Sequence, residues 1–493
     1  MNRQIRRVAV AVGVMMGALL LNLDYVQVLK SDAYRNDDRN SRVILATYSR
    51  PRGQIVVEGM PVADSVATKD ELKYLRRYPS GPEYAAVTGH YTRDYGLDGI
   101  EATEDDVLSG NDPRLLGRRI ADILTGRDPQ GGTIVLTLNK AAQDAAYKAL
   151  GGRRGAVVAL DPSTGAILAA VSSPSYDPNL LSSHKSDDVA KAWRAYNADA
   201  DQPMLNRALL QNYPPGSVFK VVVAAAALKR GLKPEEKIPA PSVLQLPEST
   251  VPMKNFDGEK CGDGQTDTLQ DALAISCNTA FGQLGMDLGT DSVRKQAELF
   301  GMDGEQRKTP LRTAQSSIGE VVDQAALAQT SIGQRSVVAT PLQVAMISAA
   351  VANDGVLMKP YLVQREQAPN LSTLHSTDPE LLSTVLDPTL DKMLQQMMVA
   401  VVKNGTGKKA DINIPGVVVG GKTGTADNGP TDHLNAPHAW FSGYATRQGV
   451  PKIAVAVVLE NAGVTGSESA GGAAAAPIAK DVMTAYLNDA ASD

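Results

Sequence analysis

The fold is decided by Gly155-Ala-Val-Val-Ala-Leu160-Asp-Pro-Ser-Thr-Gly165-Ala-Ile-Leu-Ala-Ala-Val-Ser172. Its two apolar runs, Gly155 to Leu160 and Ala166 to Ser172, predict a pair of β-strands. The turn-forming residues Asp161 to Gly165 between them predict a five-residue hairpin connection. This hairpin predicts two neighbouring antiparallel strands and leaves open what completes their sheet.

Apolar runs far downstream predict the rest of the sheet. They are Gly416 to Thr425, Ala439 to Ala445 and Lys452 to Glu460. Helical patterns fill most of the intervening chain, and a last one follows the strands: Val218 to Arg230, Leu269 to Leu288, Pro341 to Ala352, Thr389 to Lys403 and Ala473 to Leu487. Two strand sets split by a helical block imply one antiparallel sheet with helices on its faces. We therefore expect an α+β fold with a five-stranded sheet in residues 151–493.

The preceding residues, 30–150, predict a smaller α+β domain. Gln54 to Val57 resembles a strand that ends in a turn at Glu58-Gly59. The best helical pattern, Asp112 to Thr125, opens on Asp112-Pro113 as N-cap and first helical residue. Residues 30–43 are polar and predict a linker to the segment before them.

The N-terminus predicts a membrane anchor. Arg3, Arg6 and Arg7 precede an apolar run from Val8 to Leu21, and the apolar character continues to residue 29. As a helix, residues 8–29 would span about 33 Å, enough to cross a bilayer. The arginines would keep residues 1–7 in the cytoplasm. A cleaved signal peptide is the alternative, but no Ala-x-Ala site follows. We therefore expect a single-pass cell-membrane protein whose remaining chain faces the extracytoplasmic side, where ATP is absent.

The composition excludes several classes of protein. Of 493 residues, 43% are hydrophobic and 21% charged, and the net charge is −5, which excludes a disordered chain and gives no basic excess for nucleic acid. A mean hydropathy of −0.16 excludes a polytopic membrane protein. Two cysteines exclude a disulfide scaffold or a cysteine-rich metal module. We expect no metal and no cofactor.

Tyr213-Pro-Pro-Gly-Ser217-Val-Phe-Lys220 leads into a dense apolar helix. Proline and glycine mark its start, so Ser217 falls in the first turn and shares a face with Lys220. A hydroxyl there gains from the positive helix end, and an adjacent amine with a lowered pKa can take its proton. Ser-x-x-Lys recurs at Ser182 to Lys185, in a polar stretch that we interpret as surface. The motif alone is therefore weak.

Ser276-Cys-Asn278 lies between helical stretches. A serine hydroxyl and an asparagine amide two residues apart can face one cleft from a tight turn. The simpler interpretation of this tripeptide in isolation is a helix cap, because both residue types favour caps.

Gly420-Gly421-Lys422-Thr423-Gly424-Thr425 continues a strand. Its glycines let a ligand approach the backbone, and the lysine and threonines offer donors to a carboxylate or oxyanion. Seen alone, the segment is better interpreted as an exposed glycine-rich strand end with a solvated lysine. It also fits the phosphate-loop pattern from Gly416 onward, but valines fill the would-be loop and no helix start follows.

In this order, Ser-x-x-Lys, Ser-x-Asn and Lys-Thr-Gly resemble the signature of penicillin-recognising serine acyl enzymes. Further stretches resemble class B penicillin-binding proteins across nearly the whole chain: Arg52-Gly-Gln-Ile55, Gly96-Leu-Asp-Gly-Ile-Glu101, Leu136-Thr-Leu-Asn139 with Gln143, Ser331-Ile-Gly-Gln334, Thr340-Pro-Leu-Gln343 and Ala352-Asn-Asp-Gly355. A shortened stretch after Arg52 is most similar to the actinobacterial A type, which is tied to septal wall synthesis. The resemblance implies a serine β-lactamase-like transpeptidase domain on a pedestal that does not bind penicillin.

The resemblance also implies roles for the motif residues. The expected catalytic residues are Ser217, Lys220, Ser276, Asn278 and Lys422. The expected substrate-binding residues are Thr423, Gly424 and Thr425. Ser217 would be acylated and Lys220 would be its general base, while Ser276 relays protons and Asn278 holds the substrate amide. Lys422 and Thr423 would hold the terminal carboxylate, and backbone N–H groups of Ser217 and Thr425 would form the oxyanion hole.

The implied reaction is D-Ala-D-Ala transpeptidation between peptidoglycan stem peptides, with β-lactams trapped on Ser217. The implied partners are a glycosyltransferase and division-complex proteins, because the N-terminal domain is too short to polymerise glycan as well. A β-lactamase, a D,D-carboxypeptidase and a non-catalytic division scaffold are the alternatives. For a β-lactamase, Glu366-x-x-x-Asn370 matches the deacylating loop only loosely and comes too late in the chain.

Cys261 and Cys277 could be two buried free thiols. A count of two and an oxidising exterior favour a bridge between them. Because Cys277 is the middle residue of Ser276-x-Asn278, the hypothesised disulfide would tether the loop around Cys261 to the catalytic cleft.

Overall fold

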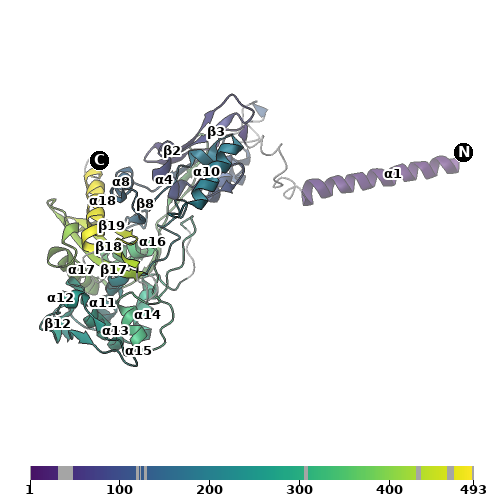
Figure 1. The fold of residues 1–493 in the computed structure, drawn as a ribbon. Helices are drawn as coiled ribbons and strands as arrows, with labels where there is room; N and C mark the ends of the chain where they lie inside the picture. Colours follow the sequence, from purple (N-terminus) through teal and green to yellow (C-terminus); the bar gives the residue numbers. More distant parts are fainter. Residues whose placement is uncertain are drawn as a thin grey trace.

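The computed structural model describes residues 2–30, 48–117, 122, 124–126, 130–304, 309–428, 435–462 and 471–490. Figure 1 shows an isolated N-terminal helix and a body of two parts stacked on each other. The N-terminal helix α1 spans Asn2–Asp24 and continues as a π-helix over Tyr25–Leu29. The window Arg3–Gln27 has a mean hydropathy of 1.8 and none of it is buried, so it fits a single-pass anchor. The linker expected at residues 30–43 lies almost wholly outside the described residues.

A five-stranded antiparallel sheet forms the centre of the larger part. Its order is β17-β18-β19-β7-β8, which joins the predicted hairpin to the three downstream strands. The strands are β7 Gly155–Leu160, β8 Ile167–Ser173, β17 Val417–Asn428, β18 Asn435–Arg447 and β19 Val450–Leu459. The predicted fold class is therefore confirmed.

Both faces of this sheet are covered by helices. Along β19, Ala454, Ala456 and Val458 enter one hydrophobic core, whereas the alternating Val455 and Val457 enter a second. Such two-sided burial explains why the strands read as continuous apolar runs. Helices α8 Lys140–Leu150 and α18 Ala476–Asp489 pack on the second face. On the first face lie α11 Lys220–Lys229, α16 Pro341–Ala352 and α17 Pro388–Lys403.

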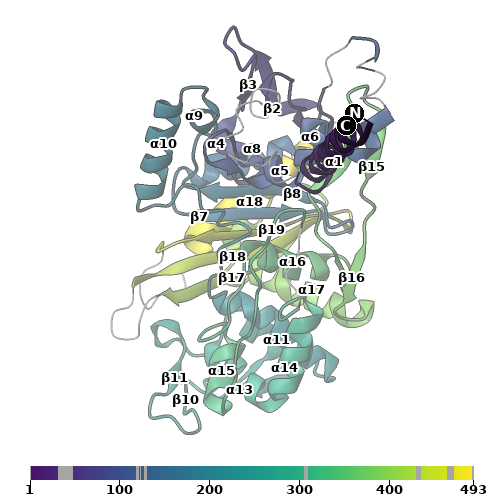
Figure 2. The same cartoon turned by 90° about the vertical axis from the view of Figure 1, so that its right-hand side faces the viewer.

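A helical subdomain lies beyond α11, on the opposite side of the sheet from the pedestal (Figure 2). Its helices are α12 Leu269–Ala274, α13 Asn278–Leu288, α14 Thr290–Leu299 and α15 Gln324–Ser331. The continuous helix predicted from Leu269 to Leu288 is wrong, because residues 275–277 interrupt it. Short strand pairs flank these helices and α16: β9 Lys237–Pro239 with β12 Thr266–Thr268, β10 Val243–Leu244 with β11 Met253–Lys254, and β13 Val356–Met358 with β16 Leu381–Thr384.

The pedestal contains a six-stranded sheet of order β15-β14-β6-β1-β2-β3. Its strands are β1 Ile55–Val57, β2 Met60–Ala67, β3 Tyr74–Arg77, β6 Thr133–Leu136, β14 Val363–Gln367 and β15 Thr373–Ser376. The strand predicted at Gln54 to Val57 and its turn are present as β1. Two of the strands come from residues 363–376, so the chain returns from the larger part to complete this sheet.

Short helices and one two-stranded ribbon complete the pedestal and its junction. They are α4 Gly81–Thr88, α5 Gly99–Thr103, α6 Asp105–Ser109, α9 Asn179–Ser182, α10 Ser186–Ala198, and β4 Tyr91–Thr92 paired with β5 Gly96–Leu97. The helix predicted from Asp112 begins as a 3₁₀ turn at Pro113–Leu115, with Asp112 accepting from the Arg114 N–H at 2.8 Å. Part of its remaining length lies outside the described residues.

Buried charges join three segments of the pedestal. The Glu101 carboxylate accepts from Nε of Arg52 at 2.5 Å and from Nε of Arg76 at 2.6 Å. Burial alone would raise the pKa of Glu101, but the two guanidinium groups outweigh it and the pKa is lowered. The carboxylate therefore stays ionised and links β3 and the segment before β1 to α5.

Candidate active site

Ser217 lies in a 3₁₀ turn, Gly216–Phe219, that leads directly into α11 at Lys220. Both side chains are buried, with Ser217 3% exposed and Lys220 fully enclosed. Gly216 has φ of 54°, and a Cβ there would lie 2.5 Å from the carbonyl oxygen of Thr425. Only glycine therefore lets this turn approach β17, which explains the residue before Ser217.

Trp440 of β18 and Glu460, which directly follows β19, hold the loop before this turn. Nε1 of Trp440 donates to the carbonyl of Pro214 at 3.0 Å. The Tyr213 hydroxyl donates at 2.8 Å to Glu460, which also accepts from Arg207. Burial would raise the pKa of Glu460, but these two partners and Arg154 outweigh it, so the pKa is lowered. An ionised anchor thus holds the loop that presents Ser217.

Ser276 occupies the break between α12 and α13. Its φ of 65° is in the left-handed region, which is uncommon for serine and marks a turn held by its surroundings. Nζ of Lys220 donates to the Ser276 carbonyl at 2.6 Å and lies 3.2 Å from its hydroxyl oxygen. The same amine donates to Oδ1 of Asn278 at 2.7 Å. Both members of the Ser-x-Asn motif therefore contact the Ser-x-x-Lys lysine.

Lys422 reaches Ser276 from the opposite wall. It lies on β17, and its Nζ donates to the Ser276 hydroxyl at 2.7 Å and to the Thr423 carbonyl at 2.9 Å. A Cβ at Gly424 would lie 2.9 Å from the carbonyl oxygen of Pro215, so this glycine admits the serine turn against the strand. Thr425 is 2% exposed and pairs with Ala439 of β18.

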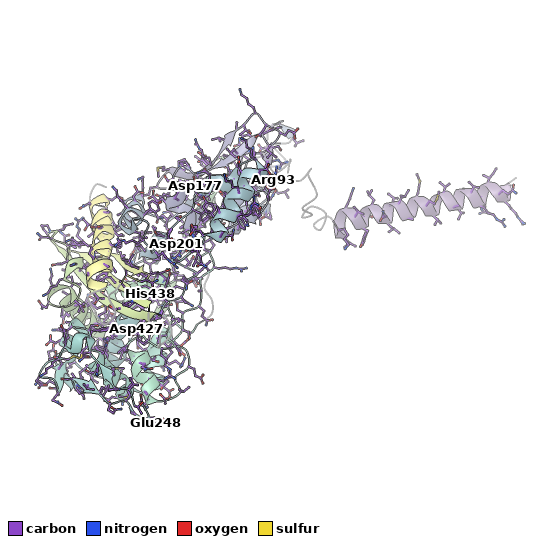
Figure 3. The ribbon with its side chains drawn as sticks, in the orientation of Figure 1. Arg93, Asp177, Asp201, Glu248, Asp427 and His438 are labelled. Atoms are coloured by element: carbon purple, nitrogen blue, oxygen red, sulfur yellow. A yellow bond between two sulfur atoms is a disulfide. The ribbon has the colours of Figure 1, made fainter. Side chains whose placement is uncertain are left out.

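Two adjoining cavities surround these groups. One of about 310 Å³ is lined by Ser217, Asn278 and Thr425, together with Asn255 and Phe256. The other, of about 420 Å³, is lined by Ser276 and shares Asn255 and Phe256. Figure 3 shows Asp427, which lines the smaller cavity, and His438 on the strand pair β17 and β18. The structure thus gathers the predicted site residues around one cleft.

Two residues of the site have no clear local signal in the sequence. Oδ1 of Asn255 accepts from the N–H groups of Asn278 and Thr279 at 2.9 and 3.0 Å, and so caps α13 from a separate loop. The Thr406 hydroxyl lies 2.5 Å from that of Thr423. Both contacts are made across the fold, so local pattern could not predict them. The cap that the sequence attributed to Ser276 or Asn278 is supplied by Asn255.

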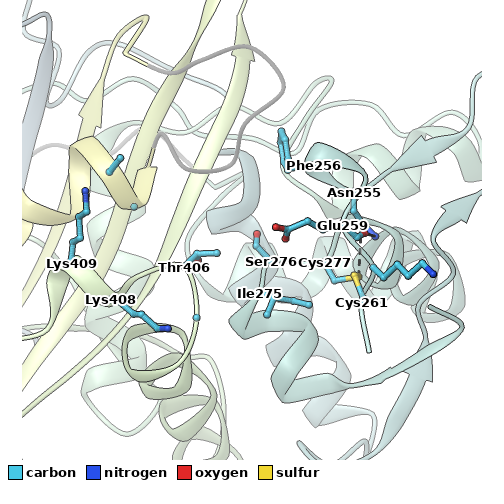
Figure 4. A pocket seen from close by; sticks show the side chains of 14 residues that line it. Asn255, Phe256, Glu259, Cys261, Ile275, Ser276, Cys277, Thr406, Lys408 and Lys409 are labelled. Atoms are coloured by element: carbon cyan, nitrogen blue, oxygen red, sulfur yellow. Dashed lines mark hydrogen bonds between the residues drawn. A yellow bond between two sulfur atoms is a disulfide. The ribbon is translucent and has the colours of Figure 1, made fainter. Parts of the chain in front are cut away.

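A disulfide joins Cys261 to Cys277, the hypothesised pair. Figure 4 shows it beside Asn255 at the wall of the larger cavity. The loop from Asn255 to Cys261 is thereby attached to the turn that carries Ser276, as expected.

The competing motifs find other roles. Gly416 to Thr423 lies almost wholly in strand β17, which continues to Asn428, so no phosphate loop forms. The second Ser-x-x-Lys match lies at the pedestal, where the Ser182 hydroxyl donates to the Arg76 carbonyl at 2.9 Å. Ser182 is buried, which corrects its interpretation as a surface residue. Glu366, the loose β-lactamase match, lies in β14 and pairs with Arg114.

Comparisons with known proteins match both parts of the chain. Residues 155–484 match the penicillin binding protein transpeptidase domain, and residues 52–134 match the penicillin binding protein A dimerisation domain. The peptidoglycan D,D-transpeptidase PbpA of Mycolicibacterium smegmatis is 46% identical over 494 residues, covering 99% of this chain and all of the relative. PbpA of Mycobacterium tuberculosis is 45% identical over 492 residues, covering 99% of each chain.

Solved structures similar to this chain are also penicillin-binding proteins or D,D-transpeptidases. The ceftriaxone acyl-enzyme complex of penicillin-binding protein A from M. tuberculosis has a TM-score of 0.86 and 45% identity, covering 90% of this chain and all of that one. The D,D-transpeptidase domain of a peptidoglycan glycosyltransferase from Eggerthella lenta has a TM-score of 0.75 and 31% identity, with 90% and 100% covered.

Proposed function

The chain belongs to the penicillin-binding protein transpeptidase family, and we propose that Ser217 is its acylated nucleophile. It is a serine-type peptidoglycan D,D-transpeptidase of class B, which β-lactams inhibit by acylation. The observation that carries the residue assignment is the Ser276 hydroxyl, held between the amines of Lys220 and Lys422 next to the cavity of Ser217. No other cluster among the described residues combines the three motifs.

Acylation begins with transfer of the Ser217 hydroxyl proton. Lys220 accepts it as general base, and its buried position one helical turn from Ser217 and in contact with Ser276 supports this role. The Ser217 oxygen attacks the carbonyl of the penultimate D-Ala. Backbone N–H groups of Ser217 and Thr425 stabilise the oxyanion.

The leaving D-Ala takes its proton through Ser276. That hydroxyl lies within hydrogen-bonding distance of both lysine amines, so it can pass a proton from the Ser217 side to the departing nitrogen. Asn278 holds the donor amide, while Lys422, Thr423 and the Gly424 backbone beside them position the terminal carboxylate. A second stem's amine then attacks the acyl-enzyme, and the energy of the first peptide bond is carried into the cross-link without ATP.

The N-terminal apolar helix fits a single-pass membrane anchor. We propose that Arg3, Arg6 and Arg7 hold its start in the cytoplasm and that both domains face the extracytoplasmic side. The proposed division is a pedestal from residue 30 to 150 and a transpeptidase domain from 151 to 493, with strands β14 and β15 of the second region completing the pedestal sheet. The pedestal would engage division-complex proteins and a glycosyltransferase that supplies glycan strands, because an N-terminal region of this length is too short to polymerise glycan as well.

Labelling with a fluorescent penicillin tests the nucleophile. The wild-type chain should retain a covalent label that Ser217→Ala abolishes, while Ser182→Ala, from the second Ser-x-x-Lys match, should retain it. Label on Ser217→Ala would disprove the assignment, and absence of label on the wild type would favour a scaffold. Rapid release of the penicilloyl group would favour a β-lactamase. Glu366 lies in the pedestal sheet, so we expect a persistent adduct instead.

A further inference from the structure

Of the residues that line the larger cavity, the acylation step described above uses Ser276 alone. Its volume is about 420 Å³, and Ser276 lines it whereas Ser217 does not. Thr406, which contacts Thr423 at 2.5 Å, lies in its wall opposite the disulfide. The cavity therefore begins where the terminal carboxylate and the departing amine of the donor would lie.

Charged side chains line this cavity from both sides. Glu259 and Lys260 come from the loop that the Cys261–Cys277 disulfide attaches to the Ser276 turn, whereas Lys408 and Lys409 follow α17. Figure 4 shows the Glu259 side chain directed toward Ser276, with Lys408 and Lys409 on the other side of the cavity. Within the described part of the chain, none of the four forms an ion pair. Their charges are thus available to a ligand.

We propose, resting on the function above, that this cavity binds the acceptor stem peptide through an amine and a nearby carboxylate. Glu259 positions the ammonium group, and Lys408 and Lys409 receive the carboxylate. The donor stem occupies the smaller cavity because Asn278 and Thr425 lie there. Aminolysis of the acyl-enzyme reverses the departure of D-Ala in chemical type, so the attacking amine enters along the path that the leaving amine took.

Aminolysis of the acyl-enzyme exchanges one bond at the acyl carbon and moves two protons. The acceptor ammonium first loses one proton to solvent and becomes nucleophilic beside Glu259. Its nitrogen attacks the acyl carbon on Ser217, the C–N bond forms and the C–Oγ bond breaks. The second nitrogen proton passes through Ser276 to Oγ of Ser217. The products are the cross-linked amide and the free serine hydroxyl.

The backbone near Glu259 is held in place although its side chain is exposed. Nδ2 of Asn255 donates to the Glu259 carbonyl at 3.1 Å, and Cys261 is fastened two residues later. The same Asn255 caps the helix that begins at Asn278. One residue therefore sets the position of Glu259 relative to the catalytic turn, which suits a group that must place an amine accurately.

The test measures how the acyl-enzyme partitions between aminolysis and hydrolysis. Full-length protein is given a synthetic D-Ala-thioester donor and either an acceptor peptide with an amine and a free carboxylate, or an alkyl amine without a carboxylate. This product ratio is set after acylation and does not depend on the acylation rate. We expect Glu259→Gln to lower the ratio for both acceptors about threefold to fivefold, the worth of one exposed charge pair.

Lys408→Gln/Lys409→Gln should lower the ratio for the carboxylated peptide only. Glu235 is an exposed carboxylate that does not line the cavity, so the matched control Glu235→Gln should match the wild type. An unchanged ratio in Glu259→Gln, or equal loss for both acceptors in the lysine variant, would overturn the proposal. These outcomes are distinct from failure of the proposed function, in which the wild type forms no acyl-enzyme at all.

Discussion

Nζ of Lys422 donates a 2.7 Å hydrogen bond to the hydroxyl of Ser276, joining a strand of the central sheet to the helical subdomain. Both side chains are buried. Because the same hydroxyl lies 3.2 Å from Nζ of Lys220, this one oxygen connects the amines of two motifs that are about two hundred residues apart in the sequence. The cleft therefore depends on a contact that crosses its two walls.

Removing either partner of this contact should slow acylation. We expect Lys422→Ala and Ser276→Ala each to reduce the second-order rate of penicillin acylation by about 10²-fold, because each removes a proton-relay or charge-stabilising group. The double variant should be little slower than either single one, since both substitutions break the same bond. Stopped-flow acylation rates measure this, and multiplicative losses would show that the two side chains act independently.

Asn255 should affect both stability and acylation. Asn255→Ala removes the acceptor of two α13 N–H groups, so we expect a loss of about 1 kcal/mol and a lower Tm. We also expect about tenfold slower acylation, because the turn carrying Ser276 loses its support. Asp387→Ala is the matched control: Asp387 likewise accepts from two N–H groups, at the start of α17, away from the cleft. Equal acylation rates in the two variants would contradict this role.

The disulfide should stabilise the catalytic domain. Its cysteines are 16 residues apart, and closing a loop of this size is worth about 3 kcal/mol. We expect reduction, or the Cys261→Ser/Cys277→Ser variant, to lower the denaturant midpoint and to slow acylation by loosening the loop that holds Asn255. Thiol titration of unreduced, unfolded protein exported from the cell should find no free thiol. Two free thiols there would refute the pairing.

Local pattern predicted the central sheet well for a physical reason. The strands are buried on both faces, so their apolar runs are long and bounded by turn residues, as at Gly155 to Leu160. Helix α16 was predicted at its observed bounds because Thr340 caps it, Pro341 begins it and all its residues are buried. The motif residues Ser217, Ser276 and Lys422 were identified by type and order along the chain.

What the sequence could not predict depends on contacts across the fold. The helical apolar pattern continues from Leu269 to Leu288. Ser276 nevertheless leaves the helix, because Lys422 holds its hydroxyl and Lys220 holds its carbonyl. Asn255 acts on α13 from another loop. Strand β14 pairs with β6 more than two hundred residues earlier and exposes part of its length, so it lacks the apolar signal of the central strands.

Asp391 should make the stability of the folded chain fall as pH rises. It lies in α17, where burial, opposed by a hydrogen bond from Gln395 and reinforced by Asp354, raises its pKa to about 8. An unfolded aspartate has a pKa of about 4, so between these two pKa values the folded state binds the extra proton and loses stability with increasing pH.

Asp391→Asn keeps an acceptor for Gln395 and cannot ionise. We expect its Tm to exceed that of the wild type by about 5 °C at pH 8 and the difference to vanish near pH 4. Calorimetry across this range measures the effect, and Asp354→Asn controls for the neighbouring exposed carboxylate, which pairs with Lys392. A Tm difference that does not change with pH would show that Asp391 does not titrate in this window.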